Sequence, residues 1–177
     1  MSEFEIRRLE WADMPPVTKA LVLWKSSAPP GLTPAIFRHH FGDLCLAVAS
    51  KSRGVAGILI GTLEPGVPDC AMIQMLAVDP ELFGAGTTRL LINRFIMIAK
   101  EKGCDSVIIA LPFKSRTFTQ FFTLNGFEPS PPPPEMKVGA LPAGKTDARA
   151  GTAADPAYWW RDYYAAGEHA VVMRMGI

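Results

Sequence analysis

The chain has 177 residues, 49% of them hydrophobic and 20% charged, which is typical of a globular domain. Eighteen basic residues stand against 17 acidic ones, so the basic surplus of an electrostatic nucleic-acid binder is missing. The three cysteines lie far apart, and neither they nor the histidines have metal-ligand spacing, which favours a reducing cytoplasm and no metal. No signal peptide is expected, and no apolar run reaches the roughly 18 residues of a membrane span.

The first half of the chain predicts a strand, two helices and then three strands in succession. Residues 4–9 alternate apolar and polar, as a half-buried strand does. Asp13 is a candidate N-cap for a helix over residues 14–25, and Thr33 for a shorter helix that ends near Phe41. Three apolar runs then predict strands over residues 44–50, 54–63 and 70–78.

The second half predicts helices and strands in alternation. A long helix is expected over residues 85–102, because Leu91, Phe95 and Ile98 would share one buried face. Gly103 is placed to end this helix. A buried strand, a helix ended by Gly126 and a further strand follow, over residues 106–111, 115–125 and from 127 onward. The order of elements is that of an α+β fold with an antiparallel meander in its middle.

The C-terminal quarter differs in character and is expected to hold an insertion over about residues 129–167. It begins with a run of prolines, which favours a stiff extended chain. Asp155-Pro156 predicts the start of an aromatic helix over residues 156–166, and residues 169–175 predict a last strand. The helix would carry one broad aromatic face. Two hypotheses stay open for that face: it docks on the chain's own core, or it anchors a homo-oligomer or another protein.

Two glycines stand between a predicted strand and the long helix. The strand ends at Val78, and Gly84 and Gly86 precede the helix. Glycines there let backbone N–H groups approach an anion such as a pyrophosphate, and the helix N-terminus adds unpaired donors and its positive dipole end. The alternative is a plain strand–turn–helix. A dinucleotide-binding turn is excluded, because Asp105 starts the next strand and Arg89 occupies the third glycine position.

This loop, together with the order of elements, resembles the GNAT superfamily of acyl-CoA N-acyltransferases. Glu81-Leu82-Phe83-Gly84-Ala85-Gly86 falls on the family's loop Gln/Arg-x-x-Gly-x-Gly/Ala. The preceding Leu76-Ala77-Val78-Asp79-Pro80 and the later helix that ends in Asn125-Gly126-Phe127 also resemble the family pattern. The resemblance implies a single GNAT-like domain over residues 1–177, with a mainly antiparallel central sheet flanked by helices and a core of about residues 4–128 plus 169–176.

The resemblance implies acetyl-CoA as the acyl donor. Backbone groups at the end of the fourth strand would hold its pantetheine arm, and the amides of the loop would hold its pyrophosphate. The thioester would lie between the fourth strand and the strand over residues 106–111. The implied cofactor-binding residues are Leu76, Ala77, Val78, Phe83, Gly84, Ala85, Gly86, Thr87 and Thr88.

Three positions depart from the family's catalytic pattern. Glu81 replaces the Gln or Arg of the loop and brings a carboxylate toward the pyrophosphate. Gln74 falls where many members carry a Glu base, and a carboxamide is no base near neutral pH. Phe122 falls where a Tyr acid is usual, and it has no proton to give.

The catalytic candidates are therefore Glu64 and Asp69 as substitute bases, Gln74, and Tyr163 as an acid from the aromatic helix. Solvated turn carboxylates and a packing tyrosine are the alternatives for these positions. The leading hypothesis is direct transfer of an acetyl group to a primary amine of a small molecule or peptide. The second is a catalytically reduced GNAT-fold protein that serves as a structural or binding subunit of an assembly such as a virion.

Overall fold

The computed structural model describes residues 4–23, 39, 42–50, 54–64, 67, 69–82, 86–112, 115–131, 160–165 and 168–177. The described chain forms two compact units, Met1–Val107 with Ile177, and Ile108–Gly176. The helix expected to begin at Thr33 lies outside the described residues, apart from His39.

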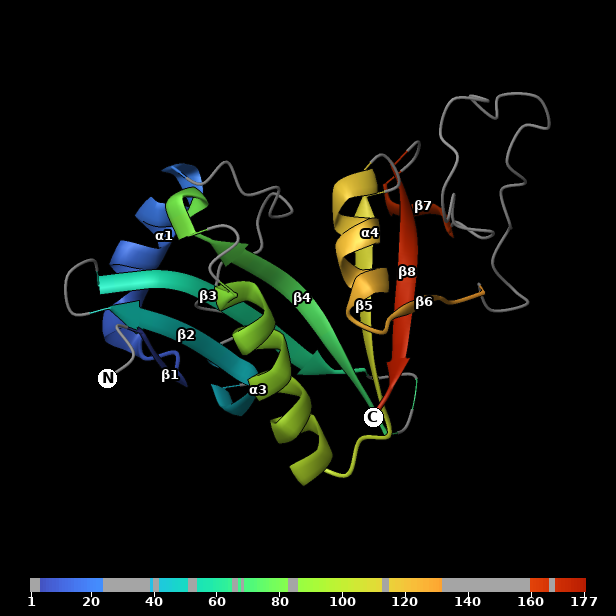
Figure 1. Ribbon diagram of the computed structural model, residues 1–177, viewed down its shortest axis with the longest axis horizontal. Coiled ribbons are helices and arrows are strands. Elements are labelled where there is room, and N and C mark those ends of the chain that lie inside the picture. The colour runs from blue at the N-terminus through green and yellow to red at the C-terminus, as the bar shows by residue number, and fades with distance from the viewer. Residues whose placement is uncertain are drawn as a thin grey trace. The chain divides into compact units, whose positions relative to one another are not determined.

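The first unit contains four strands in the order of the chain, each antiparallel to the next (Figure 1). They confirm the strands that the sequence predicts. The first strand has no buried residue, whereas the apolar runs of the other three are mostly buried on both faces of the sheet. Their bounds are β1 Phe4–Arg8, β2 Cys45–Ser50, β3 Gly54–Leu63 and β4 Cys70–Val78.

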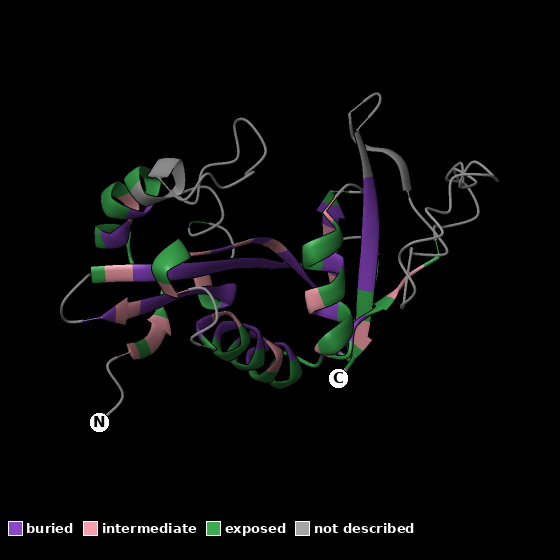
Figure 2. Ribbon diagram, turned by 45° about the horizontal axis from the view of Figure 1, so that its top comes forward, coloured by how far each residue is buried: buried purple, intermediate pink, exposed green. Residues whose placement is uncertain are grey.

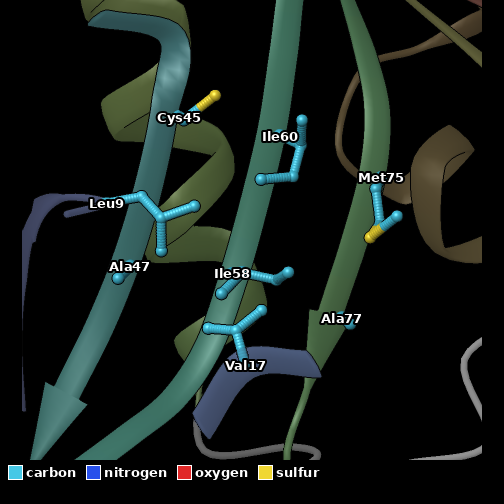
Figure 3. Close-up of a cluster of buried hydrophobic side chains, with 8 residues drawn as sticks. All are labelled: Leu9, Val17, Cys45, Ala47, Ile58, Ile60, Met75 and Ala77. Atoms are coloured by element: carbon cyan, nitrogen blue, oxygen red, sulfur yellow. The ribbon is translucent and has the colours of Figure 1, made fainter. Parts of the chain in front are cut away.

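One face of this sheet packs against helix α1, Met14–Leu23. Figure 3 shows Val17 of α1 beside side chains that β2, β3 and β4 send to the same face. The cluster is dry, since its members are at most 8% exposed. Its residues are Leu9, Val17, Cys45, Ala47, Ile58, Ile60, Met75 and Ala77.

The opposite face packs against helix α3, Thr87–Glu101, whose outer side is exposed (Figure 2). Leu91, Phe95 and Ile98 are buried, as the spacing predicts. Gly61 in β3 leaves room for the Phe95 ring: an added Cβ would stand 2.1 Å from Phe95 Cε2. Gly103 ends the helix with φ +84°.

Asp13 does not cap α1 as the sequence predicts. It ends the short 3-10 helix η1, Trp11–Asp13, and its carboxylate accepts two hydrogen bonds from the Arg7 guanidinium, at 2.7 and 2.8 Å. It also accepts the backbone N–H of Glu10 at 2.8 Å. The carboxylate of Asp13, which the sequence assigns to the start of the helix, is thus hydrogen-bonded to the guanidinium of Arg7 on β1 instead. A second 3-10 helix, η2 Gly42–Leu44, leads into β2.

The second unit takes up most of β5, Ser106–Pro112, and continues with helix α4, Arg116–Leu124. Gly126, with φ +87°, ends α4: its N–H donates to Thr123 O at 3.1 Å, and that of Phe127 to Phe122 O at 3.0 Å. These two bonds form a Schellman motif, so the predicted glycine stop is confirmed. The last strands are β6 Glu128–Pro129 and β8 Glu168–Gly176, and β8 lies between β5 and β6.

The prediction of an aromatic helix over residues 156–166 is wrong for the residues that the structure describes. Trp160–Ala165 form a strand, β7, which pairs antiparallel with β8 through Trp160↔Ala170 and Ala165↔Glu168. Trp and Tyr favour strands over helices, and only two residues separate β7 from β8, which is a hairpin spacing. The edge of β8 therefore decides the structure of this segment, and residues 156–159 lie outside the described part.

Candidate functional site

The turn between β4 and α3 is fastened to the sheet by Asp79. Its N–H donates to Ala56 O of β3 at 2.9 Å, and its carbonyl accepts the N–H of Leu82 at 2.8 Å. Its carboxylate accepts the N–H of Glu81 at 3.0 Å, so the 3-10 helix η3, Pro80–Leu82, starts from a fixed point. The Glu81 side chain is exposed, as expected if it turns away from a bound anion.

Gly86 takes up the position before the first residue of α3 with φ +79°, in the left-handed region. An added Cβ would meet nothing within 4 Å, so the backbone conformation, rather than crowding, demands glycine here. Its carbonyl accepts the first helical hydrogen bond, from Leu90 N–H at 3.0 Å. Phe83, Gly84 and Ala85 of the expected cofactor loop lie outside the described residues.

The first turn of α3 has the properties of an anion-binding helix start. The earliest N–H groups of a helix have no acceptor within it, and they lie at the positive end of its dipole. The turn contains no acidic residue, and Arg89 adds a positive charge on its exposed side. Thr87 is buried and Thr88 half-buried. Of the predicted site residues, Leu76, Ala77 and Val78 approach this turn from the end of β4.

Gln74 lies at a β-bulge in the middle of β4. Ile60 pairs with Met75 and Gly61 pairs with Ile73, so Gln74 is the extra residue between two registered pairs. Its half-buried carboxamide Nε2 donates to Thr62 Oγ1 at 3.1 Å and approaches Met72 Sδ at 3.2 Å. The bulge therefore turns a polar group out of an otherwise apolar strand and fixes its orientation.

Glu64 and Asp69 lie at the opposite end of β4 from the start of α3. Asp69 has φ +59° and is exposed, and its carbonyl accepts the N–H groups of Asp105 and Ser106 at 2.8 and 3.3 Å. Glu64 is half-buried, and its N–H donates to Cys70 O at 2.8 Å. The nine steps from Asp69 to Val78 span about 30 Å of extended strand. The structure thus does not bring these carboxylates to the helix start.

The remaining two positions considered for catalysis, Phe122 and Tyr163, belong to the second unit. Phe122 is 1% exposed and contacts Phe121 and Phe127 edge-on, with ring centroids 5.4 and 5.1 Å apart, so it is a core residue. Tyr163 lies on β7, and its side chain is outside the described part. Sequence reasoning missed Thr62, the partner of Gln74, because only a known strand register places two residues of neighbouring strands side by side.

No metal centre accompanies these residues in the part of the chain that the structure describes, where no three His, Cys, Asp or Glu side chains are grouped to hold an ion. Among the described helices, none is long and apolar enough to cross a membrane.

The glycine turn and the helix start that favours anions agree with the resemblance seen in the sequence, and comparison with known families supports it. The profile of the acetyltransferase (GNAT) family matches residues 4–123. The chain belongs to this family. No curated protein sequence matches the chain significantly.

Solved structures of N-acetyltransferases have the same fold. The NatC complex bound to Gag peptide and CoA includes a chain with TM-score 0.69 and 15% identity, with 99% of both chains covered. Ard1 from Thermoplasma volcanium has a TM-score of 0.67 and 16% sequence identity, again with 99% of both chains covered. The ribosomal-protein-S18-alanine N-acetyltransferase from Escherichia coli has a TM-score of 0.62 and 17% sequence identity. The match covers 98% of this chain and 94% of that one. At these identities the likeness establishes the fold.

Proposed function

We propose that the protein is an N-acetyltransferase that moves an acetyl group from acetyl-CoA to a primary amine of a small molecule or peptide. The observation that carries the proposal is the start of α3: Gly86 in the left-handed conformation, followed by a helical turn with no acidic residue. This arrangement suits a pyrophosphate. Similarity to a chain of a complex solved with CoA supports the same donor.

In this proposal the cofactor runs along the end of β4 to α3. Backbone groups of Leu76 and Val78 hydrogen-bond the pantetheine arm, and Ala77 between them pairs with Ile58 of β3. The amides from Phe83 to Thr88 hold the pyrophosphate, and Arg89 adds charge. The exposed Glu81 side chain stays outside this contact.

The reaction is a direct transfer. The nitrogen lone pair of a neutral amine attacks the thioester carbonyl, the C–S bond breaks, and the CoA thiolate gains the proton that the nitrogen loses. Gln74 removes no proton, but its Oε1 is available to accept a hydrogen bond from the amine, because Nε2 is already engaged by Thr62. Glu64, Asp69 and Tyr163 stay the candidates for proton transfer.

The first experiment is isothermal calorimetry of acetyl-CoA with the wild-type protein and Gly86→Glu. Gly103→Glu is a matched control: its φ is +84° against +79° at Gly86, and an added Cβ meets nothing at either position. Both variants acquire the same strain and charge, but Gly103 lies at the other end of α3. We expect micromolar binding that only Gly86→Glu abolishes. Absence of binding to the wild type at millimolar acetyl-CoA would contradict the proposal.

Once an acceptor is found, pH–rate profiles assign the base. Loss of a general base costs about 10²–10⁴ in rate and removes the limb of the profile that reports its pKa. Glu64→Gln and Asp69→Asn are measured separately. A variant that keeps both its rate and its profile excludes that carboxylate.

The structural-subunit hypothesis rests on the departures at Glu81, Gln74 and Phe122 and on the aromatic segment. Residues Trp160–Ala165 of that segment form a strand and not a helix, so the three departures are what still supports it. A homo-oligomer and a cytoplasmic location stay predictions from the sequence.

A further inference from the structure

A pocket of about 270 Å³ lies in the first unit, away from the β4–α3 junction. Its walls come from the strand β1, from η2 and the start of β2, and from the C-terminal half of α3. None of the residues assigned above to the cofactor or to catalysis lines it. Its lining residues are Ile6, Arg7, Arg8, Asp43, Leu46, Arg94, Ile98, Glu101 and Lys102.

Four of the six charged side chains already have partners. Asp43 accepts Arg8 on one carboxylate oxygen at 3.0 Å and Lys102 on the other at 3.2 Å. This triad links the wall of β1 to the end of α3. Arg7 is paired with Asp13 outside the pocket. These charges are therefore positioned before any ligand arrives.

The other two charges, Arg94 and Glu101, have opposite signs and no ion-pair partner among the described residues. Both side chains are exposed, and they lie seven residues apart on the stripe of α3 that faces the pocket. Two helical turns place their backbones about 10 Å apart along the axis. A positive and a negative group thus stand at the two ends of one surface.

The lining between them is mainly polar and includes three aliphatic residues. Ile98 lies between Arg94 and Glu101 on the helix and is 8% exposed, and Leu46 of β2 is 1% exposed. Ile6 of β1 is half-buried beside them. A ligand that spans the two charges would therefore meet Ile6 as its main apolar contact, with Ile98 and Leu46 almost fully covered.

The helix dipole gives this arrangement a direction. Glu101 is the last residue of α3, at the negative end, where a bound cation is favoured. Arg94 lies in the middle of the helix, where the dipole opposes a bound anion little. Of the remaining pocket charges, Arg8, Arg94 and Lys102 outnumber Asp43 and Glu101, so the carboxylate end of a ligand gains more than its ammonium end.

We propose that this pocket binds a linear zwitterion, an ω-amino carboxylate with a short aliphatic spacer. Its carboxylate pairs with Arg94, its ammonium pairs with Glu101, and its spacer lies against Ile6. The pocket shares no residue with the acetyl-CoA site, so the inference does not depend on the proposed function.

The test uses three probes of one length: 6-aminohexanoate, hexanoate and hexylamine. Binding to the full chain at pH 7 is followed by NMR, through the methyl groups of Ile6 and Ile98 and the amides of α3. We expect 6-aminohexanoate to bind most tightly, hexanoate next and hexylamine least.

Two substitutions separate the ends of the ligand. Arg94→Gln is expected to weaken the binding of 6-aminohexanoate and hexanoate about tenfold and to leave the binding of hexylamine unchanged. Glu101→Gln is expected to weaken the binding of 6-aminohexanoate and hexylamine and to leave the binding of hexanoate unchanged. Lys100→Gln, an exposed α3 position outside the pocket, is the control and is expected to change nothing.

Three results would overturn the inference. Hexanoate that binds as tightly as 6-aminohexanoate would make the pocket a simple anion site. An equal effect of Lys100→Gln would show diffuse surface charge. Unshifted Ile6 and Ile98 methyl groups at 10 mM 6-aminohexanoate would show that the pocket is not occupied.

Discussion

At the scale of single residues, Arg7 and Asp13 join the edge strand to the helical layer. Their ion pair is bidentate, and the Asp13 side chain is only 9% exposed. The hydrogen bonds from Arg7 hold the pKa of the Asp13 carboxyl below its ordinary value. The pair therefore stabilises the folded state wherever Asp13 is ionised.

Asp13→Asn is expected to lower the free energy of unfolding by about 1–3 kcal/mol at pH 7. A carboxyl whose pKa is lowered in the folded state adds its full share to the free energy of unfolding when the pH is above its pKa in the unfolded chain, about 3.9. This share is lost as the pH falls through the pKa of the folded state. Urea titrations should thus show a constant difference between the proteins from pH 7 to pH 5 that closes below about pH 4. Asp105→Asn, at an exposed carboxylate, is the control. A difference independent of pH would contradict the assignment.

Gly61 is a second residue whose role depends on one neighbour. Any Cβ there would overlap the ring of Phe95, which is fully buried. Gly61→Ala is expected to cost about 1–3 kcal/mol of unfolding free energy by overpacking. The double variant Gly61→Ala/Phe95→Leu should cost less than the sum of the single changes, because leucine lacks the overlapping ring atoms. Additive costs by chemical denaturation would refute the steric explanation.

At the scale of elements, α4 is held by one aromatic residue. Phe122 is 1% exposed between Phe121 and Phe127, whereas Phe118 on the same helix is 43% exposed. Phe122→Ala is expected to cost about 3–5 kcal/mol of unfolding free energy, as for other buried aromatic residues. Phe118→Ala should cost less than about 1 kcal/mol. Equal losses in thermal or urea unfolding would contradict the packing role of Phe122.

At the scale of the whole molecule, the proposed donor is expected to stabilise the native state. At 100 times its Kd, acetyl-CoA would add about 2.7 kcal/mol to the free energy of unfolding. For a chain of this size that corresponds to a rise in Tm of about 5–10 °C. Differential scanning fluorimetry should show this rise for the wild type and Gly103→Glu but not for Gly86→Glu. A rise in Gly86→Glu as well would place the cofactor elsewhere.

Most elements follow from local pattern. The strands β2, β3 and β4, the helix α3 and the glycine stops at Gly103 and Gly126 follow from apolar spacing and from backbone conformations that glycine adopts without strain. The family also follows, because its loop is a short motif. The bulge at Gln74 does not, since it depends on the register between two strands.

Three features depend on neighbours along the chain and can be predicted without the structure: the hydrophobic period, the helix ends and the glycine turn before α3. Other features depend on neighbours in space and become visible only in the folded chain. Asp13 pairs with Arg7 instead of capping α1, and Trp160–Ala165 form a strand because β8 offers backbone partners. Local propensities differ by only about 1 kcal/mol or less per residue, so one ion pair or one strand edge outweighs them.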